Sequence, residues 1–509
     1  MIKGQNGKSF ALTHLREHLE RCIGKTLGEL DVAHVFRSVA NVKKRTGIAG
    51  DVVEYSVLSL PKEGHSKQAP DIEIDGAHYE VKTTGMRRNN KKDPRLVAKE
   101  PVTITAVSPQ KITQEEYRSS AFWHKVEHLL FLYYFYDSSK AIPPSRIVSP
   151  SDYAGFPLLS YQFHEYEDFS AEEQRTLEND WCIVRDFVAF LHVNYSDYEK
   201  EYPRISYELR PKLMLLDTAP KWPHNPRFRF KRSFVTTIYL RHVEQAKRQK
   251  EVLRRAHGGY ESVQDIVDEC SSIVSKYKGK TVEWLCNHFC ISAKKELKSI
   301  AEPVIVRMFG GTRKRMDDID LFSKVGIVGK SIVFTKGGGR TEDTKFFTID
   351  FAEIADEIVS FEDSQFYEYF SSHKILFAIF EEPNQEASLL DNRFLGFSLI
   401  TLDEKFIQEN VRPVWERVRQ LVLRKELVNL PICYKRGQHK GEQRVNKNGV
   451  LSSVPNFPKS KEGIVFVRGT GADSRDKREV VNGIRMYCQQ VWIKGTYLSS
   501  IVAQSPKIT

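Results

Sequence analysis

The strongest chemical signal in the sequence is a set of acidic and basic residues between Pro70 and Lys82. The segment reads PDIEIDGAHYEVK and contains Asp71, Glu80 and Lys82. Carboxylates are good ligands for a divalent cation, and a cation held by only two of them keeps several bound waters. One such water can become a nucleophile, with a lysine to orient it, deprotonate it or stabilise the developing charge. The spacing therefore indicates metal-assisted hydrolysis; the alternative is an exposed hairpin with ordinary surface charges.

The dipeptide Asp75-Gly76 predicts how these side chains are placed. An Asp-Gly pair between alternating runs is a strong hairpin signal, because both turn residues adopt positive φ. With a two-residue loop, Asp71 lies opposite Glu80, and Lys82 shares the face of Glu80. The β-carbons of two opposed carboxylates are about 5 Å apart, so the carboxylates repel each other unless a cation lies between them.

Glu54 is a further acidic candidate. It ends the run Gly47-Ile-Ala-Gly50-Asp-Val-Val-Glu54, which predicts a helix ahead of the hairpin. Oxygen ligands of this kind suit Mg²⁺. We expect Asp71 and Glu80 to hold the ion, with Glu54 as an additional acidic group.

The order of motifs resembles the PD-(D/E)xK nuclease superfamily, whose D…ExK signature falls on Asp71, Glu80 and Lys82. The surroundings are similar to the MutH mismatch-repair nuclease and to related type II restriction enzymes of the Sau type, which cut at GATC. The runs KTLGEL at Lys25–Leu30 and HYEVKT at His78–Thr83 resemble the start and the active-site strand of that family. The resemblance covers nearly the whole chain.

The resemblance implies further site residues. Lys125, in the run WHKVEHLLFL, corresponds to an additional active-site lysine that the family carries on a strand. The run LRPK at Leu209–Lys212 resembles a loop that reaches into the DNA groove, and FRFKRSFVTT at Phe228–Thr237 resembles the closing element of the family. The runs IVFVRGTGADSRD and VWIKGTYLSSIV resemble the C-terminal domain of the Sau-type enzymes. The DNA-contacting candidates are Arg210, Lys212, Arg229, Lys231, Arg468 and Lys494.

The sequence departs from the family in two places. The spacing from Asp71 to Glu80 is two residues longer than the family pattern, which a longer hairpin accommodates. Arg229 stands where the family has a tyrosine beside the base to be read. Sensitivity to adenine methylation and the recognised sequence are therefore open.

The two halves of the chain resemble each other in order. The tripeptide Gly24-Lys25-Thr26 recurs as Gly279-Lys280-Thr281, and the segments 77–83 and 230–238 have counterparts at 325–331 and 493–501. Neither tripeptide has the upstream glycine of a phosphate-binding loop. We expect each glycine to end one helix and each threonine to cap the next.

This pattern predicts an α/β protein with two tandem MutH-like domains, each a mixed sheet flanked by helices. Residues 1–245 form the catalytic domain and 263–509 a degenerate duplicate, joined by a charged linker at 246–262. We expect the charged run 242–259 to be an exposed helix that leads into a hinge. Val328 stands where the counterpart of Glu80 should be, while Lys330 keeps the lysine position. The second domain should therefore be catalytically silent. The resemblance implies that it still binds DNA and that a second DNA copy bound there regulates cleavage.

Composition agrees with a nucleic-acid enzyme. The 509 residues contain 77 Lys+Arg against 66 Asp+Glu, a formal net charge of +11, which favours a polyanionic partner. No apolar run approaches the roughly 18 residues of a membrane span. Seven scattered cysteines indicate a reducing cytoplasm, and we interpret Cys286-x-His288-x-Cys290 as core packing because no second ligand pair stands nearby.

The sequence thus predicts a Mg²⁺-dependent type II restriction endonuclease acting on double-stranded DNA at a short palindrome, GATC being favoured. Alternatives are a partner-activated nicking nuclease of the MutH type and a non-catalytic DNA-binding regulator. Cutting both strands with one active site requires a dimer on DNA or two successive nicks. The basic run from Arg87 to Lys92 follows the active-site strand and either grips DNA or forms a solvated loop.

Overall fold

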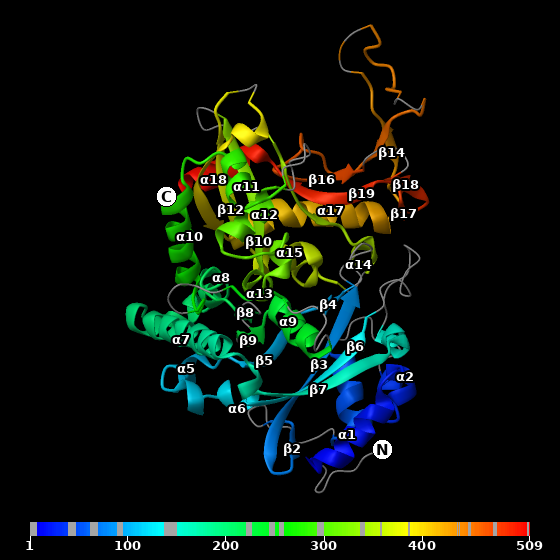
Figure 1. Cartoon of the computed structure of the whole chain (residues 1–509). Coiled ribbons are helices and arrows are strands. Elements are labelled where there is room, and N and C mark those ends of the chain that lie inside the picture. Colours follow the sequence, from blue (N-terminus) through cyan, green and yellow to red (C-terminus); the bar gives the residue numbers. More distant parts are fainter. Residues whose placement is uncertain are drawn as a thin grey trace.

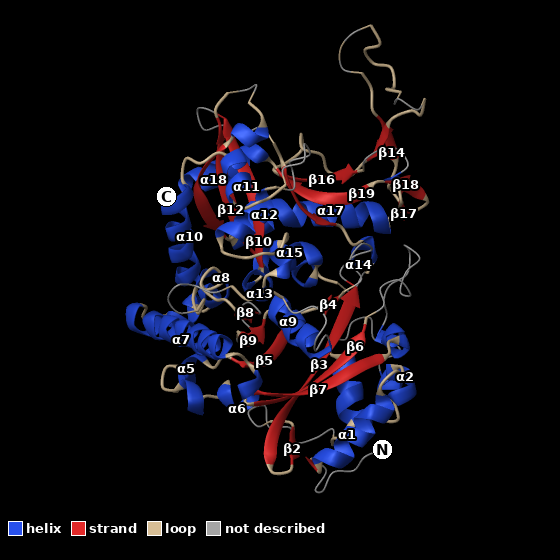
Figure 2. Ribbon diagram, in the orientation of Figure 1, coloured by secondary structure: helices blue, strands red, loops and turns tan. Residues whose placement is uncertain are grey.

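The computed structural model of the chain places its two halves one above the other (Figure 1). It describes residues 8–38, 47–61, 70–88, 95–136, 150–219, 226–243, 250–253, 259–292, 300–335, 342–356, 359–384, 387–434, 436, 438–445, 449–471, 476–505 and 508. Helices flank the sheets of both halves (Figure 2). The mixed α/β class predicted from the sequence is confirmed.

The main sheet of the first half is mixed. Its strand order is β1-β2-β3-β6-β7, with β4 paired to the far end of β3. The pairs β1/β2 and β3/β6 are parallel, and β2/β3, β3/β4 and β6/β7 are antiparallel. The strands are β1 (Ser9–Phe10), β2 (Ile72–Ile74), β3 (Ala77–Arg88), β4 (Leu96–Ala98), β6 (His128–Phe135) and β7 (Leu158–Glu165).

The central strand β6 is buried on both faces, which explains its unbroken apolar run. Leu130, Leu132 and Tyr134 belong to the hydrophobic cluster that contains α1 (Leu12–Cys22), α2 (Leu27–Leu30) and α4 (Ile48–Val52). Leu129 and Phe131 belong to the cluster that contains α7 (Ala171–Asn194) and α9 (Arg232–Val243). This strand therefore forms a rigid floor beside β3.

A smaller antiparallel sheet completes the first half. It joins β5 (Val102–Ala106), β9 (Arg227–Phe230) and β8 (Leu216–Ala219), with β9 in the middle. Helix α9 begins almost directly after β9.

The second half contains two three-stranded sheets with the same connections. Strand β10 (Ile327–Thr335) pairs in parallel with β12 (Lys374–Glu382), which pairs antiparallel with β13 (Arg393–Ile400), as β3, β6 and β7 do. Strands β11 (Thr344–Thr348), β19 (Cys488–Ile493) and β16 (Val465–Thr470) repeat the order β5-β9-β8, and α18 (Gly495–Gln504) follows β19. The remaining elements include α10 (Val263–Tyr277), α11 (Val282–His288), α17 (Arg412–Leu423) and two hairpins, β14/β15 (Asn429–Pro431 and Ser453–Pro455) and β17/β18 (Glu479–Val481 and Ile484–Met486).

The two Gly-Lys-Thr turns have the predicted structure. Gly24 and Gly279 follow helices α1 and α10 with φ of 81° and 80°. Thr26 caps α2 through the backbone amide of Glu29, and Thr281 caps α11 in the same way. Each turn is also hydrogen-bonded to the start of a strand. The amide of Gly24 donates to the carbonyl of Leu158 in β7 (2.8 Å), and the amide of Gly279 donates to the carbonyl of Phe394 in β13 (2.7 Å).

The predicted exposed helix over 242–259 is wrong at residues 250–253, while the predicted hinge lies mostly outside the described residues. Helix α9 ends at Val243, and residues 244–249 and 254–258 lie outside the described residues. Glu251 forms a parallel bridge with Ile319, so the chain here is extended. Leu253 is buried, and so is Tyr260 just beyond it. Apolar burial against the second half holds this segment despite its charged composition.

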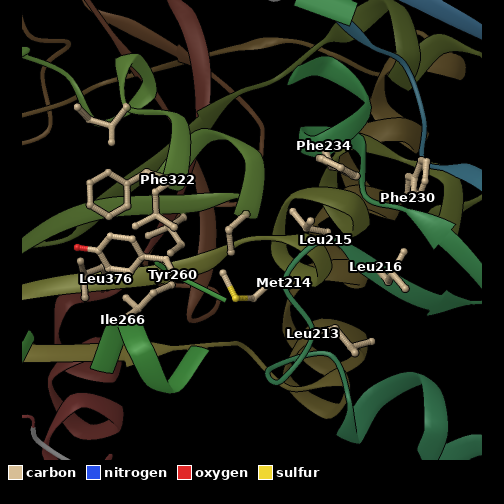
Figure 3. Packing of buried hydrophobic residues seen from close by; sticks show 14 of the residues in the cluster. Leu213, Met214, Leu215, Leu216, Phe230, Phe234, Tyr260, Ile266, Phe322 and Leu376 are labelled. Atoms are coloured by element: carbon tan, nitrogen blue, oxygen red, sulfur yellow. The ribbon is translucent and has the colours of Figure 1, made fainter. Parts of the chain in front are cut away.

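One hydrophobic core continues from the first half into the second. It joins Phe230, Phe234 and the buried run Leu213–Leu216 to Tyr260 and Phe322 on the other side (Figure 3). The predicted domains are therefore packed against each other across a shared core.

Two lysines are buried where the halves meet. The Nζ atoms of Lys231 and Lys374 both donate to the carbonyl of Leu213, each at 2.7 Å. Burial lowers the pKa of Lys231, an effect that nearby Asp180 opposes, and it lowers the pKa of Lys374 well below its ordinary value. Two like charges at one carbonyl are costly in this setting.

Replacing Lys374 by Met should stabilise the protein. The carbonyl of Leu213 keeps the hydrogen bond from Lys231, while one buried ammonium group is removed. We expect the free energy of unfolding at pH 7 to rise by about 1 kcal/mol. Because the folded protein favours neutral Lys374, the free energy of unfolding of the wild type increases with pH toward the ordinary lysine pKa of 10.5. The stability advantage of Lys374→Met over wild type should therefore shrink over that range.

Urea unfolding of the two proteins at pH 7 and pH 10 measures this effect. Lys405→Met, at an exposed position of the second half, is the matched control and should change little. A Lys374→Met protein less stable than wild type at pH 7 would contradict the electrostatic account.

Candidate active site

The β2–β3 hairpin places the first carboxylate as predicted. Asp75 and Gly76 have φ of 47° and 88°, and Ile72 pairs with Tyr79 in the register expected for a two-residue loop. The amide of Asp71 donates to the carbonyl of Tyr79 (3.1 Å). One carboxylate oxygen of Asp71 accepts from the amide of Val81 (2.9 Å), which orients Asp71 toward the strand that carries Glu80.

Glu80 is a buried carboxylate held by two lysines. Its side chain is only 4% exposed. Lys82 donates to Oε1 at 2.7 Å, and Lys125 donates to both oxygens at 2.9 and 2.8 Å. These two ammonium groups offset the cost of burying the charge.

Lys125 reaches this site from a helix, which corrects the expectation of a strand. It lies in α6 (Trp123–Val126), immediately before β6. The parallel register pairs Glu80 with Leu129, so the end of α6 lies beside Glu80. The strand itself begins only at His128, three residues after Lys125.

Glu54 lies in the same electrostatic cluster. It belongs to a π-helical turn, Val53–Val57, that continues α4, and the amide of Leu58 closes this wide turn on the carbonyl of Val53 (2.8 Å). The pKa of Glu54 is raised to about 7, chiefly by burial and then by the carboxylates of Asp71, Asp51 and Glu80, while Lys82 opposes the shift. Turns of this kind are frequent at functional sites because they shift a side chain out of helical register.

The donor set fits a hard divalent cation. Among the described residues, no three His, Cys, Asp or Glu side chains gather into a complete ligand group. The chain would therefore supply two carboxylates, Asp71 and Glu80, and waters would complete the shell, which is usual for Mg²⁺. The crowding of negative charge around Glu54 also favours a cation here.

The structure brings Arg210 to the second half. Its guanidinium donates to Glu404 (3.1 Å) and to the hydroxyl of Tyr367 (3.2 Å), and its side chain is 12% exposed. Lys212, two residues on, is exposed. The loop therefore offers Lys212 to a ligand, while Arg210 is engaged within the protein.

The DNA-contacting candidates on β9 and directly after it also have partners within the protein. Arg229 forms a two-point ion pair with Asp217 of β8, at 2.7 and 3.1 Å. Lys231 is 2% exposed and buried at the junction described above. The expected contact of Lys231 with DNA is not possible in this arrangement, because its ammonium group faces the core.

The two candidates of the second half differ in exposure. Arg468 is 45% exposed, pairs with Asp343 (2.8 Å) and lies over the ring of Trp492. Lys494 is half-buried at the start of α18.

Sequence reasoning missed the carboxylates of the second half that form ion pairs with arginines of the first half. Arg87 pairs with Asp350 (3.3 Å) and Glu353 (3.6 Å), and Arg232 pairs with Glu368. These carboxylates belong to no motif, and only their spatial approach shows their role. Residues 89–94, which include Lys91 and Lys92 of the predicted basic run, lie outside the described residues.

The structure also describes the Cys-x-His-x-Cys run and the helices. Cys286 is buried and Cys290 is exposed. No described helix is both long and apolar enough to cross a membrane.

The hairpin, its carboxylates and the two lysines define the class of the site. Residues 60–163 match the family model described as DNA mismatch repair enzyme MutH, and this range contains Asp71, Glu80, Lys82 and Lys125. Over 415 residues the chain is 21% identical to the type II restriction enzyme Sau3AI of Staphylococcus aureus, covering 78% of this chain and 77% of that protein. The two matches support a MutH-like type II restriction endonuclease.

Removing Lys125 should destabilise the protein without metal. Lys125→Met leaves buried Glu80 with Lys82 alone, and we expect the free energy of unfolding to fall by about 2 kcal/mol. Lys111→Met, at an exposed position of α5 (Pro109–Ile112), is the matched control and should stay within about 0.5 kcal/mol of wild type. Urea unfolding in a chelating buffer measures both; equal stabilities would show that the Lys125–Glu80 pair contributes nothing.

Proposed function

We propose that this chain is a Mg²⁺-dependent site-specific deoxyribonuclease that cuts double-stranded DNA at a short palindrome, GATC being favoured. The observation that carries this proposal is the ion-pair cluster of Glu80 with Lys82 and Lys125, beside which Asp71 accepts from the amide of Val81. The two comparisons support the class of enzyme.

The side chains divide the work of phosphodiester hydrolysis. Asp71 and Glu80 would hold Mg²⁺, which polarises the phosphate and lowers the pKa of bound water. With Glu80 engaged by the cation, Lys82 would be available to orient or deprotonate the attacking water or to stabilise the developing charge. Lys125 would remain beside Glu80 and fix its direction, and Glu54 would add acceptor capacity at the edge of the site.

Glu80→Ala and Lys82→Ala should each abolish cleavage while leaving DNA binding largely intact. Both substitutions remove groups that act on the reacting phosphate, whereas the surface that binds DNA is unchanged. We expect rates to fall by at least about a thousandfold. Plasmid cleavage and gel-shift assays measure the two properties, and His78→Ala, at an exposed position of the same hairpin, is the control. Robust cleavage by either variant would remove the assignment.

Digestion of unmethylated and adenine-methylated plasmid by the purified protein tests specificity. Discrete ends at GATC support the favoured site, and ends at another motif keep the mechanism and change the specificity. The absence of cleavage without a partner favours the MutH-type nicking enzyme, and a protein that binds DNA without binding Mg²⁺ favours the non-catalytic regulator.

We further propose that residues 1–245 and 263–509 are tandem MutH-like domains and that the second is silent. The shared strand orders support duplication. In the β10 register Val328 pairs with Ile375, at the place where Glu80 pairs with Leu129. No strand equivalent to β2 pairs with β10 among the described residues, so the second half offers a counterpart to neither Glu80 nor Asp71.

The contacts between the halves support a regulatory role for the second domain. Arg210, a DNA-contacting candidate, and two further arginines of the first half, Arg87 and Arg232, are each paired with a carboxylate of the second half. DNA phosphates and these carboxylates compete for the same cations. DNA bound by the second domain, through Arg468, Lys494 and their neighbours, would favour a state in which the two domains are separated. The arginines of the first domain would then be released from their ion pairs, which would activate that domain.

Glu404→Gln should therefore increase cleavage. The substitution removes the charge that holds Arg210 but keeps the shape of the side chain, and we expect the rate on single-site DNA to rise by about threefold to tenfold. Glu409→Gln, at an exposed position of the same helical segment, is the control. An unchanged rate for Glu404→Gln, measured under single-turnover conditions, would show that this pair does not restrain the enzyme.

The remaining expectations concern assembly and location. A dimer on DNA would provide a second active site for the second strand. Sedimentation of a cleavage-inactive variant with and without DNA tests this assembly. The seven free cysteines support a cytoplasmic protein.

A further inference from the structure

A cavity of about 300 Å³ lies in the second half, far in sequence from the active site. Its lining comes from the base of the β14/β15 hairpin, the loop before β16, strands β16 and β19, and the end of β18. Its apolar wall residues include Ile432, Pro455, Phe466, Met486 and Tyr487, and its cationic residues are Arg468, Lys477, Arg485 and Lys459.

Two polar atoms of this lining have no hydrogen-bond partner among the described residues. One is Nζ of Lys459 and the other is Oε1 of Gln489. Gln489 is 1% exposed, and its Nε2 atom donates to the carbonyl of Tyr487 (2.8 Å). This bond fixes the orientation of the amide and leaves its oxygen as an unused acceptor. A buried polar group without a partner is costly, so such a pair indicates a ligand that completes it.

Two of the cationic residues around the cavity have identified contacts. Arg468 pairs with Asp343, and Lys477 lies over the ring of Tyr487. Glu462 attracts Lys459 electrostatically, yet burial still lowers the pKa of that lysine to about 8. A donor and an acceptor thus stand in an apolar cavity with cations around it.

The chemistry favours one kind of ligand. A flat heterocycle that carries both a donor and an acceptor suits Lys459 and Gln489, the apolar and aromatic side chains suit its faces, and a phosphate suits the cations. We propose that this cavity binds a nucleotide, with its base against Lys459 and Gln489. The inference deepens the proposed function, on which it rests for the idea that nucleic acid reaches the second half.

The cavity lies at the counterpart of the β8/β9 strand pair. Val465 pairs with Ile493 as Leu216 pairs with Phe230, so β16 and β19 correspond in register to β8 and β9. Between β16 and β19 the chain forms the β17/β18 hairpin, which supplies Arg485 and Met486 to the cavity.

Titration of the full-length protein with the four deoxynucleoside 5′-monophosphates, without Mg²⁺, tests the site. We expect at least one to bind, and 2-deoxyribose 5-phosphate, which lacks a base, to bind at least about tenfold more weakly. Lys459→Met and Gln489→Leu should each weaken nucleotide binding by about tenfold or more. Lys461→Met, at an exposed position two residues on, is the control. Lys459→Met removes an unpartnered buried ammonium group, so its urea midpoint should not fall and a folding defect will not obscure the result.

A second experiment identifies where the base comes from. Duplexes containing the cleavage site carry 2-aminopurine at or beside each position in turn, and its fluorescence rises when stacking is lost. A rise with wild type that Lys459→Met abolishes assigns the ligand to an unstacked base of bound DNA. Nucleotide binding without such a rise assigns it to a free nucleotide.

Absence of any variant-sensitive nucleotide binding, together with the absence of a fluorescence rise, overturns the inference. Cleavage is measured in parallel on the same proteins. Normal Mg²⁺-dependent cleavage with an unresponsive cavity removes only the nucleotide site, whereas loss of cleavage by wild type removes the proposed nuclease.

Discussion

The parallel pairing of β3 with β6 is the constraint on which the site depends. It sets Glu80 beside Leu129 and thereby brings Lys125, from the helix before β6, into contact with the carboxylate. Strand β6 can hold this position because it is buried on both faces by two separate clusters. A slip of one residue would turn Glu80 and Lys82 to the opposite face of the sheet, so the hydrophobic pattern of β6 protects the chemistry of β3.

Electrostatics explains how Glu80 can be buried. Its carboxylate forms ion pairs with both Lys82 and Lys125. Under the proposed mechanism a cation would replace Lys82 as its partner, so the buried charge would never be left as an isolated ion.

The second half shares this framework. It has the same strand order and the same glycine-threonine turns, with Val328 at the register position of Glu80 and the β17/β18 hairpin between β16 and β19. Its acidic residues instead meet arginines of the first half. Because these ion pairs lie beside a shared apolar core, separating the halves requires both new partners for the arginines and exposure of apolar surface.

The sequence by itself determined the local geometry. The Asp75-Gly76 turn fixed the hairpin register, the Gly-Lys-Thr tripeptides fixed the helix ends, and the alternating and apolar runs fixed which strands are buried, since each depends on interactions between residues close in the chain. Only the tertiary structure decided that Lys125 acts from a helix, that Lys231 is buried and that Arg210 faces Glu404. These outcomes depend on contacts between residues far apart in sequence, and no local pattern encodes which carboxylate an arginine meets across a folded interface.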